Sequence, residues 1–229
     1  MKKLIWLYVV ILGCFLGVVT LLNRAVTVYS ESYPIQDPTC VIIDAGHGGE
    51  DGGATSCNGI SESKTNLEIA LKLEDLMHLL GVQTHMIRRT DCSVATSGNT
   101  ISARKMSDLK ERVRIINETN RSLLLSIHQN TYPDSIYHGA QVFYSKKSES
   151  EALAKKLQSA FVSTVNIGSN RKIKPANGIY LMDHINCTGV LIECGFISNP
   201  EEASLLNCRE YQLKLCAVIA ASVSQFVNS

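Results

Sequence analysis

Two histidines follow runs of residues that are typical of buried strands. His47 comes shortly after the run 41–45 and stands in a loop with five glycines among residues 46–53. His128 directly follows the run 123–127. In open α/β sheets, sites form just outside the carboxyl ends of the strands, so the two imidazoles are expected to meet and to bind a zinc ion. The alternative is a glycine-rich turn that carries an incidental surface histidine.

Glu62 is the candidate for a third zinc ligand. A catalytic zinc ion commonly binds two histidines and a carboxylate and leaves one position for water. Glu62 is expected in the loop just before a helix that begins near Lys64, where its carboxylate can turn back to the sheet edge. The alternative is an acid at a helix N-terminus, stabilised by the helix dipole. Spacing alone favours neither interpretation.

Glu193 closes the apolar run 190–192. An ionisable group in such a place is costly unless it is paired or used, so Glu193 is a candidate general base; a strand-end salt bridge is the alternative. Neighbouring strand residues point to opposite faces, so Cys194 is expected to face the core. A nucleophile built from Cys194 and His128 is therefore not expected, and no Gly-x-Ser-x-Gly segment is present.

The elements that must position these residues follow a polar linker with two prolines, residues 25–38, and belong to a domain expected over residues 39–229. Predicted strands lie at 40–45, 82–88, 122–127, 140–144, 178–182 and 189–193. Apolar residues recur at helical spacing around 67–77, 106–116, 153–165 and 213–223. This alternation predicts an α/β fold with a mixed, largely parallel central sheet flanked by helices.

The first 24 residues are expected to form a signal anchor. Residues 4–22 are an uncharged run of 19 residues, which as a helix spans roughly 28 Å, close to the hydrocarbon core of a bilayer. Lys2 and Lys3 precede the run, so the positive-inside rule predicts a membrane-anchored protein with an extracytoplasmic catalytic domain. A cleaved signal peptide and a lipoprotein signal are the alternatives, since residues 11–14 resemble a lipobox.

Charge and cysteine content narrow the class of protein further. The chain has 22 Lys and Arg against 21 Asp and Glu, and the part beyond residue 24 carries a net charge near −2. No net field exists there to hold a polyanion, so nucleic acid is not an expected partner. Seven of the eight cysteines lie in this part, and an odd number cannot all pair. We expect mostly free thiols, with a set of disulfides as the alternative.

Five segments, in order, resemble the zinc-dependent N-acetylmuramoyl-L-alanine amidases of the Amidase_3 family. They are V-I-I-D-A-G-H-G-G-x-D-x-G-A, E-x-K-x-N-L-x-I-A, L-K-E-R-V-x-I-x-N, S-I-H-x-N and L-I-E-C-G-F-I-S-N. The resemblance covers about residues 39–228. It implies one zinc ion per chain with His47, Glu62 and His128 as ligands, and Glu193 as the catalytic residue. The implied substrate is peptidoglycan, cut between N-acetylmuramic acid and L-alanine.

A lone catalytic domain behind a signal anchor most resembles the CwlD-type branch of this family, which acts in making muramic-δ-lactam in spore cortex for germination. The chain departs from the family at Ser63, where Lys or Arg commonly follows the ligand glutamate. It departs again at residues 130–138, a stretch that leaves little room for the autoinhibitory helix of some relatives. Regulation would therefore come from outside the chain, through an activator protein.

Two other functions compete with the amidase interpretation. One is a zinc carboxypeptidase that acts on stem peptides, and the other is a non-catalytic module that binds peptidoglycan. The remaining histidines divide into two groups. His78 and His85 lie in a predicted helix and a predicted strand and are expected to be structural. His138 and His184 lie in predicted loops and are candidates for lining a substrate groove.

Overall fold

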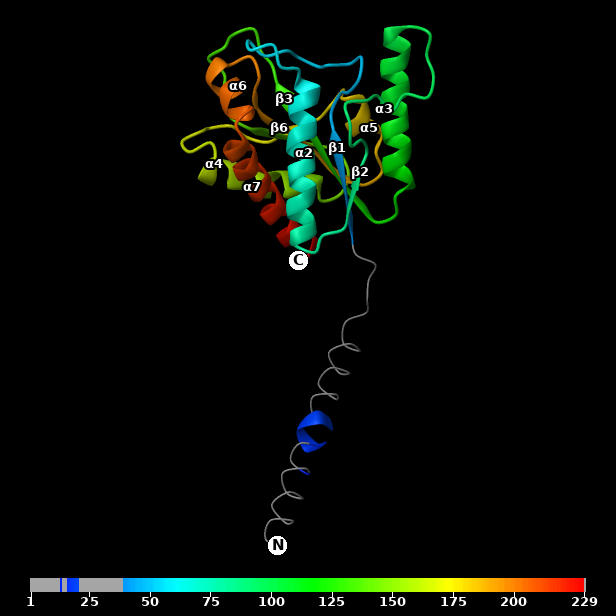
Figure 1. Cartoon of the computed structure of the whole chain (residues 1–229), viewed down its shortest axis with the longest axis vertical. Helices are drawn as coiled ribbons and strands as arrows, with labels where there is room; N and C mark the ends of the chain where they lie inside the picture. Colours follow the sequence, from blue (N-terminus) through cyan, green and yellow to red (C-terminus); the bar gives the residue numbers. More distant parts are fainter. Residues whose placement is uncertain (1–12, 14–15, 21–38, 229) are drawn as a thin grey trace, which may run out of the picture. The chain divides into compact units, whose positions relative to one another are not determined.

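Six strands form one mixed sheet in the computed structural model, which describes residues 13, 16–20 and 39–228 (Figure 1). The order across the sheet is β2-β1-β3-β6-β4-β5. The strands are β1 (Cys40–Ala45), β2 (Thr84–Met86), β3 (Ser122–Asn130), β4 (Gln141–Tyr144), β5 (Lys174–Pro175) and β6 (Thr188–Phe196). The first three and β6 are parallel, whereas β4 runs antiparallel to β6. The prediction of a mixed α/β sheet is confirmed.

Helices cover both faces of this sheet. One layer holds α2 (Glu62–Leu79), α4 (Ser150–Thr164) and α7 (Arg209–Val227); the other holds α3 (Ile101–Glu118) and α5 (Tyr180–His184). In Figure 1, α2 and α7 lie side by side across the sheet, as their shared core residues require. Side chains alternate between the layers, because Ile43 packs under α2 while its neighbour Ile42 packs in the α3 and α5 cluster.

Two strands are longer than the sequence predicts, and this matters for the site. The runs 122–127 and 189–193 extend to Asn130 and Phe196 in β3 and β6. His128, predicted just after its strand, and Glu193, predicted at the end of its strand, therefore both lie inside paired strands and are held by the backbone hydrogen bonds. Asn199 then caps the short helix α6 (Pro200–Leu206), which the sequence analysis did not predict.

The predicted strand 178–182 is wrong: these residues enter the short helix α5. Gly178 has a φ of 80°, and its backbone N–H donates to the Asp183 carboxylate at 2.9 Å, which turns the chain into the helix. Leu181 and Met182 are both buried although they are adjacent, as a helix lying against a core permits. A short apolar run does not by itself distinguish a strand from a buried helix.

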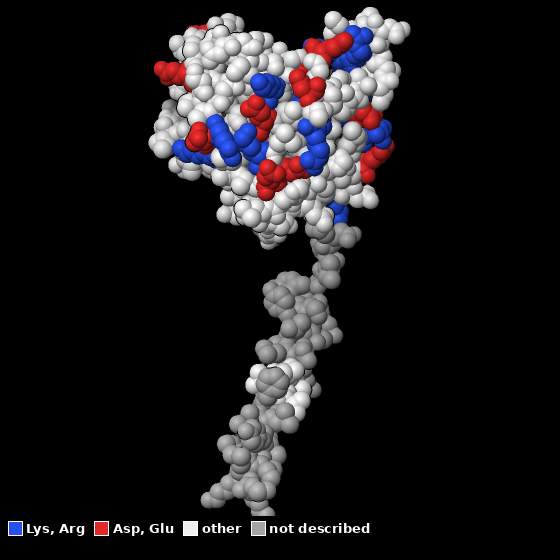
Figure 2. All heavy atoms as spheres, in the orientation of Figure 1, with Lys and Arg blue, Asp and Glu red and all other residues white. Residues whose placement is uncertain are grey.

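The predicted signal anchor (1–24) and linker (25–38) lie outside the described residues, apart from residues 13 and 16–20. Within the described part of the chain, no helix combines the length and apolar character that crossing a membrane requires. From Thr39 onwards the chain forms one compact unit. Acidic and basic side chains are interspersed over the face that α2 and α7 cover (Figure 2).

The seven described cysteines are all free, which confirms the expectation of mostly free thiols for this part of the chain. Cys194 and Cys216 are fully buried between the sheet and α7 and behave as small apolar side chains. Burial raises the pKa of both thiols, so neither is a ready nucleophile.

Candidate metal centre

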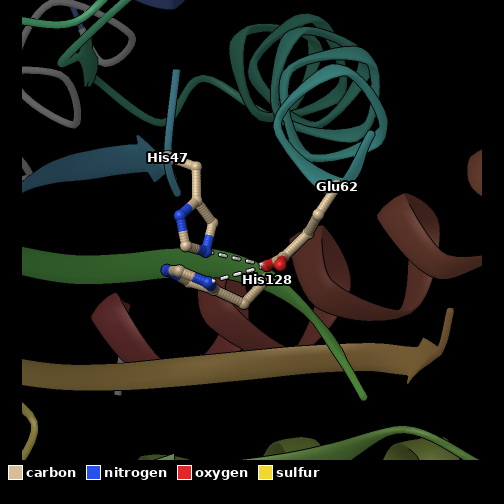
Figure 3. A group of neighbouring side chains, drawn as sticks. All are labelled: His47, Glu62 and His128. Atoms are coloured by element: carbon tan, nitrogen blue, oxygen red, sulfur yellow. Dashed lines mark hydrogen bonds and ion pairs between the residues drawn. The ribbon is translucent and has the colours of Figure 1, made fainter. Parts of the chain in front are cut away.

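Three elements bring His47, Glu62 and His128 together at one edge of the sheet (Figure 3). His47 follows β1, and His128 lies near the carboxyl end of β3, which is the parallel neighbour of β1. Glu62 is the first residue of α2, the helix whose N-terminus lies over that edge. The residues that were predicted to meet from sequence do so in the structure.

The three side chains offer one ligand atom each to a common point. Glu62 Oε1 lies 3.3 Å from His47 Nε2 and 3.0 Å from His128 Nδ1. The two imidazole centroids are 5.0 Å apart, with the rings at 73° to each other. The three donor atoms all lie within 4.8 Å of one another. Two imidazoles and a carboxylate are the donor set that catalytic zinc sites use, so the residues fit this metal.

At two glycines the backbone lies very close to the side chains of these ligands. A Cβ on Gly46 would lie 2.2 Å from Nε2 of His128, and a Cβ on Gly53 would lie 2.6 Å from Oε2 of Glu62. His47 itself has a φ of 60°, a left-handed conformation that side-chain-bearing residues seldom adopt. Such strain persists where the surrounding structure holds it, and it clusters at functional sites.

The structure corrects the expected place of Glu62. It was predicted in the loop before a helix near Lys64, but the helix begins at Glu62 itself, which is 4% exposed. Its carboxylate accepts backbone N–H groups from Ala54 at 3.0 Å and Gln129 at 3.1 Å, and the Asn66 amide donates at 3.3 Å. Both carboxylate oxygens are thereby held in place. The helix start was missed because Glu62 and Ser63 are polar yet buried, so apolar spacing gave no sign of them.

Electrostatics couple the three groups. Burial alone would raise the pKa of Glu62, but His128 and His47 outweigh it and hold that pKa well below its usual range. Burial alone would lower the pKa of His47, but Glu62 and Asp51 raise it to about 9. Asp51 Oδ2 lies 2.9 Å from His47 Nδ1, and its other oxygen lies 2.7 Å from Lys105 Nζ. Asp51 therefore orients the imidazole so that Nε2 faces the centre.

Glu193 lies directly across the ladder from His128. Its Oε2 atom is sealed from solvent and has no hydrogen-bond partner among the described residues, and no salt bridge there involves Glu193. Burial raises the pKa of Glu193 to about 7, with the nearby Glu62 charge acting in the same direction. Cys194 packs on the opposite face, as period two requires. An unpaired carboxyl group with this pKa can exchange protons near neutral pH.

A buried arginine from α3 holds the His47 loop from beneath, and sequence reasoning assigned it no role. Arg112 pairs with Asp44 and, at 2.6 Å, with Asp108. Its Nη2 donates to the carbonyl of His47 at 2.7 Å. In the sequence, Arg112 is the arginine of the segment L-K-E-R-V.

A second buried arginine, Arg88, joins β1 to α2. Besides the nearby carbonyl of Thr90, it donates to those of Ala45 at 2.8 Å, Gly46 at 3.0 Å and Ser63 at 2.8 Å. The loop after β1 and the N-terminus of α2 are thereby fixed to each other. No local pattern in the sequence could have revealed the last three contacts, because they join residues 25 to 43 positions apart.

The other histidines lie away from this centre. His78 and His85 occupy α2 and β2, the kinds of element predicted for them. His138 lies in a loop and lines a cavity of about 660 Å³. His184 ends α5 instead of lying in a loop, and it stacks on Tyr180 with ring centroids 4.0 Å apart.

Comparison with known proteins identifies the family. The profile described as "Amidase_3: N-acetylmuramoyl-L-alanine amidase" matches residues 41–225. A germination-specific N-acetylmuramoyl-L-alanine amidase of Bacillus subtilis is 38% identical over 188 residues, which cover 81% of this chain and 78% of that protein.

Solved structures agree with this. The CwlD amidase from Clostridioides difficile, solved in complex with the GerS lipoprotein, has a TM-score of 0.79 and 38% identity over 83% of this chain and 98% of that one. An N-acetylmuramoyl-L-alanine amidase from Clostridium difficile 630 has a TM-score of 0.72 and 29% identity over 85% and 99% of the two chains. The chain therefore belongs to the Amidase_3 family and is an N-acetylmuramoyl-L-alanine amidase.

Proposed function

We propose that this amidase depends on zinc, held by His47, Glu62 and His128, and that it cuts the amide between the lactyl group of N-acetylmuramic acid and L-alanine. The observation that carries the proposal is the convergence of these three donors beside Glu193, whose Oε2 has no partner among the described residues. Zinc bound in such a site acts as a Lewis acid and lowers the pKa of water towards about 7.

The chain's own residues supply the proton transfers. Glu193 takes the proton of the attacking water and then delivers it to the leaving nitrogen of L-alanine, because a carboxyl group with a pKa of about 7 works in both directions. Asp51 holds the His47 ring, and Asn66 holds the Glu62 carboxylate.

The test is mass spectrometry of peptidoglycan digested by the zinc-loaded full-length chain. Free stem peptide together with unsubstituted muramic acid is the expected result. Release of a single amino acid from the end of the stem would instead indicate a zinc carboxypeptidase. Binding to peptidoglycan with no product would indicate a non-catalytic module.

We also propose a membrane-anchored, extracytoplasmic location and a role in spore cortex. The uncharged run 4–22 after Lys2 and Lys3 supports the location. N-terminal sequencing of the protein from a membrane fraction tests whether this run remains on the mature protein or is cleaved. The germination-specific relative supports the cortex role. Loss of muramic-δ-lactam from the cortex of a deletion strain is the expected outcome, and an unchanged cortex would contradict it.

A separate activator protein completes the proposal. It is supported by the similar amidase that was solved with a lipoprotein bound. Crosslinking of the tagged full-length chain in sporulating cells should capture a partner that raises kcat/KM when it is added back. Full activity of the purified chain, unchanged by any captured protein, would contradict this.

A further inference from the structure

A cationic cavity of about 660 Å³ lies between residues 136–141 and residues 168–174. Its lining includes Arg171, Lys172, Lys174 and His138, together with Tyr137. No acidic residue contributes to this lining. A cavity lined by three positively charged side chains and no acidic one attracts an anionic ligand.

This cavity adjoins Glu193 through one cross-strand step. Gln141, which also lines the cavity, is the residue of β4 directly opposite Glu193 of β6. Residues opposite each other in an antiparallel pair point to the same face, with Cα atoms roughly 4.5–5.5 Å apart. The next residue on each strand, Val142 and Ile192, packs in the other layer with α2 and α4. The cavity and Glu193 thus share one face of the sheet.

Among the cationic side chains that line the cavity, Arg171 is held in place by contacts with neighbouring residues. Its Nη1 donates to Gln141 Oε1 at 3.1 Å, and its Nε donates to the carbonyl of His138 at 2.5 Å. Its guanidinium carbon lies 4.4 Å from the centre of the Phe196 ring, a cation–π contact. Nη2 makes no hydrogen bond to any described residue, so this nitrogen of the guanidinium group can donate hydrogen bonds to a bound ligand.

Glu202 is the carboxylate whose charge acts on Arg171, and it already accepts hydrogen bonds from the backbone. Glu202 accepts backbone N–H groups from Gly139 at 2.9 Å and Phe196 at 2.7 Å, and it forms no salt bridge with Arg171. The charge of Glu202 acts on Arg171 from a distance, but no carboxylate of the described residues forms a direct salt bridge with the guanidinium group. An external carboxylate would complete it.

We infer that Arg171, with Lys172 and Lys174 around it, binds a carboxylate of the stem peptide and so selects the substrate. The inference rests on the proposed amidase site. Beyond L-alanine, the second residue of the stem carries a free carboxylate when it is D-glutamate and an amide when it is D-isoglutamine. Two residues span at most about 7 Å, which is more than the roughly 4.5–5.5 Å between the Cα atoms of opposite residues such as Gln141 and Glu193.

The experiment compares two soluble N-acetylmuramoyl tripeptides that differ only in that group. The zinc-loaded full-length chain should cleave the D-glutamate form with a kcat/KM ten- to a hundredfold higher, since hydrogen bonds to charged groups are the stronger ones. The difference should lie mainly in KM. Binding of both tripeptides to the Glu193→Gln chain, measured by calorimetry, should show the same order of affinity without turnover.

Variants assign the preference to the cavity. In Arg171→Gln the ratio of the two kcat/KM values should fall to within about threefold of one. The double variant Lys172→Gln, Lys174→Gln, whose side chains are exposed and make no hydrogen bonds among the described residues, should lower the ratio while keeping the fold. Lys214→Gln, an exposed lysine on α7, removes one charge elsewhere and should leave the ratio unchanged.

The outcomes separate the two proposals. Equal kcat/KM and equal affinity for the two tripeptides would overturn the carboxylate subsite while leaving the amidase site intact. A ratio that survives in both cavity variants would also overturn it. Failure to cleave either tripeptide, with tighter binding of the D-glutamate form, would contradict the amidase site but support the subsite.

Discussion

At the scale of single residues, the centre separates groups that hold the metal from a group that moves protons. His47, Glu62 and His128 share contacts through one carboxylate oxygen, whereas Glu193 has an oxygen with no partner among the described residues. Substitutions at the two kinds of position should therefore have different signatures.

Glu193→Gln should lower turnover at least a hundredfold, because general acid–base groups contribute about 10²–10⁴ in rate. The variant should still bind about one zinc ion per chain, as measured by metal analysis after dialysis. His47→Ala or His128→Ala should lose both zinc and turnover. If Glu193→Gln lost the metal as well, Glu193 would be a ligand and the role of Glu62 would need revision.

Asp51→Asn should weaken zinc binding about 10- to 100-fold, because a carboxylate that orients a ligating histidine contributes that much. Competition with a chromophoric chelator measures the change. Glu50→Gln is the matched control, since this neighbouring carboxylate is exposed and pairs with Arg104 instead of a ligand. Equal weakening in both variants would mean that the loop's charge, and not the contact to His47, governs affinity.

At the scale of loops and helices, the site depends on close backbone approach. Gly53→Ala and Gly59→Ala each place a side chain at a positive φ, of 67° and 76°, at a cost of about 1–2 kcal/mol. A Cβ at Gly53 would meet Glu62 and His47, whereas a Cβ at Gly59 would meet nothing within 4 Å. Only Gly53→Ala should weaken zinc binding. Equal loss of zinc in the two variants would point to backbone strain instead of contact.

Helix α3 should contribute to stability through one buried arginine. Arg112→Met leaves the buried Asp44 with a hydrogen bond from Ser126 but without its charged partner, so the free energy of unfolding should fall by about 3–5 kcal/mol in urea titrations. Arg114→Met, on the same helix, breaks exposed pairs with Glu111 and Glu118 and should have a far smaller effect. Similar losses would show that the helix, and not the buried pair, is what matters.

At the scale of the whole molecule, both helix layers reach the same edge of the sheet. Helix α2 supplies Glu62 from one layer, and α3 supplies Lys105 and Arg112 from the other. The site is thus a property of the complete domain.

A chelator should stop turnover of the full-length chain, and added zinc should restore it. Iodoacetamide should leave most activity, because Cys194, the neighbour of Glu193, is buried on the opposite face. Turnover assays after each treatment provide the measurement. Inactivation by the alkylator together with resistance to the chelator would indicate a cysteine hydrolase.

The sequence predicted those features that a local pattern records. The alternation of strands and helices predicted the sheet, and the rule for strand ends placed His47 and His128 together. Spacing left Glu62 ambiguous because its partners Ala54 and Gln129 come from separate segments. Contacts such as that of Lys105 with Asp51 join polar residues that are far apart in the sequence, so no periodic pattern of residue types predicts them.

The contacts of Arg88 with backbone carbonyls affect which substitutions the chain can accept. Arg88 donates to the carbonyls of Ala45, Gly46 and Ser63, and every amino acid has a carbonyl. A substitution at position 63 therefore preserves this contact whatever side chain it introduces, provided that the backbone keeps its path. The serine side chain at this position takes no part in the contact to Arg88; its hydroxyl oxygen lies 3.2 Å from that of Ser61. These contacts therefore constrain the donor, Arg88, and not the side chains of its acceptors; Gly46 is constrained instead by the close approach of His128.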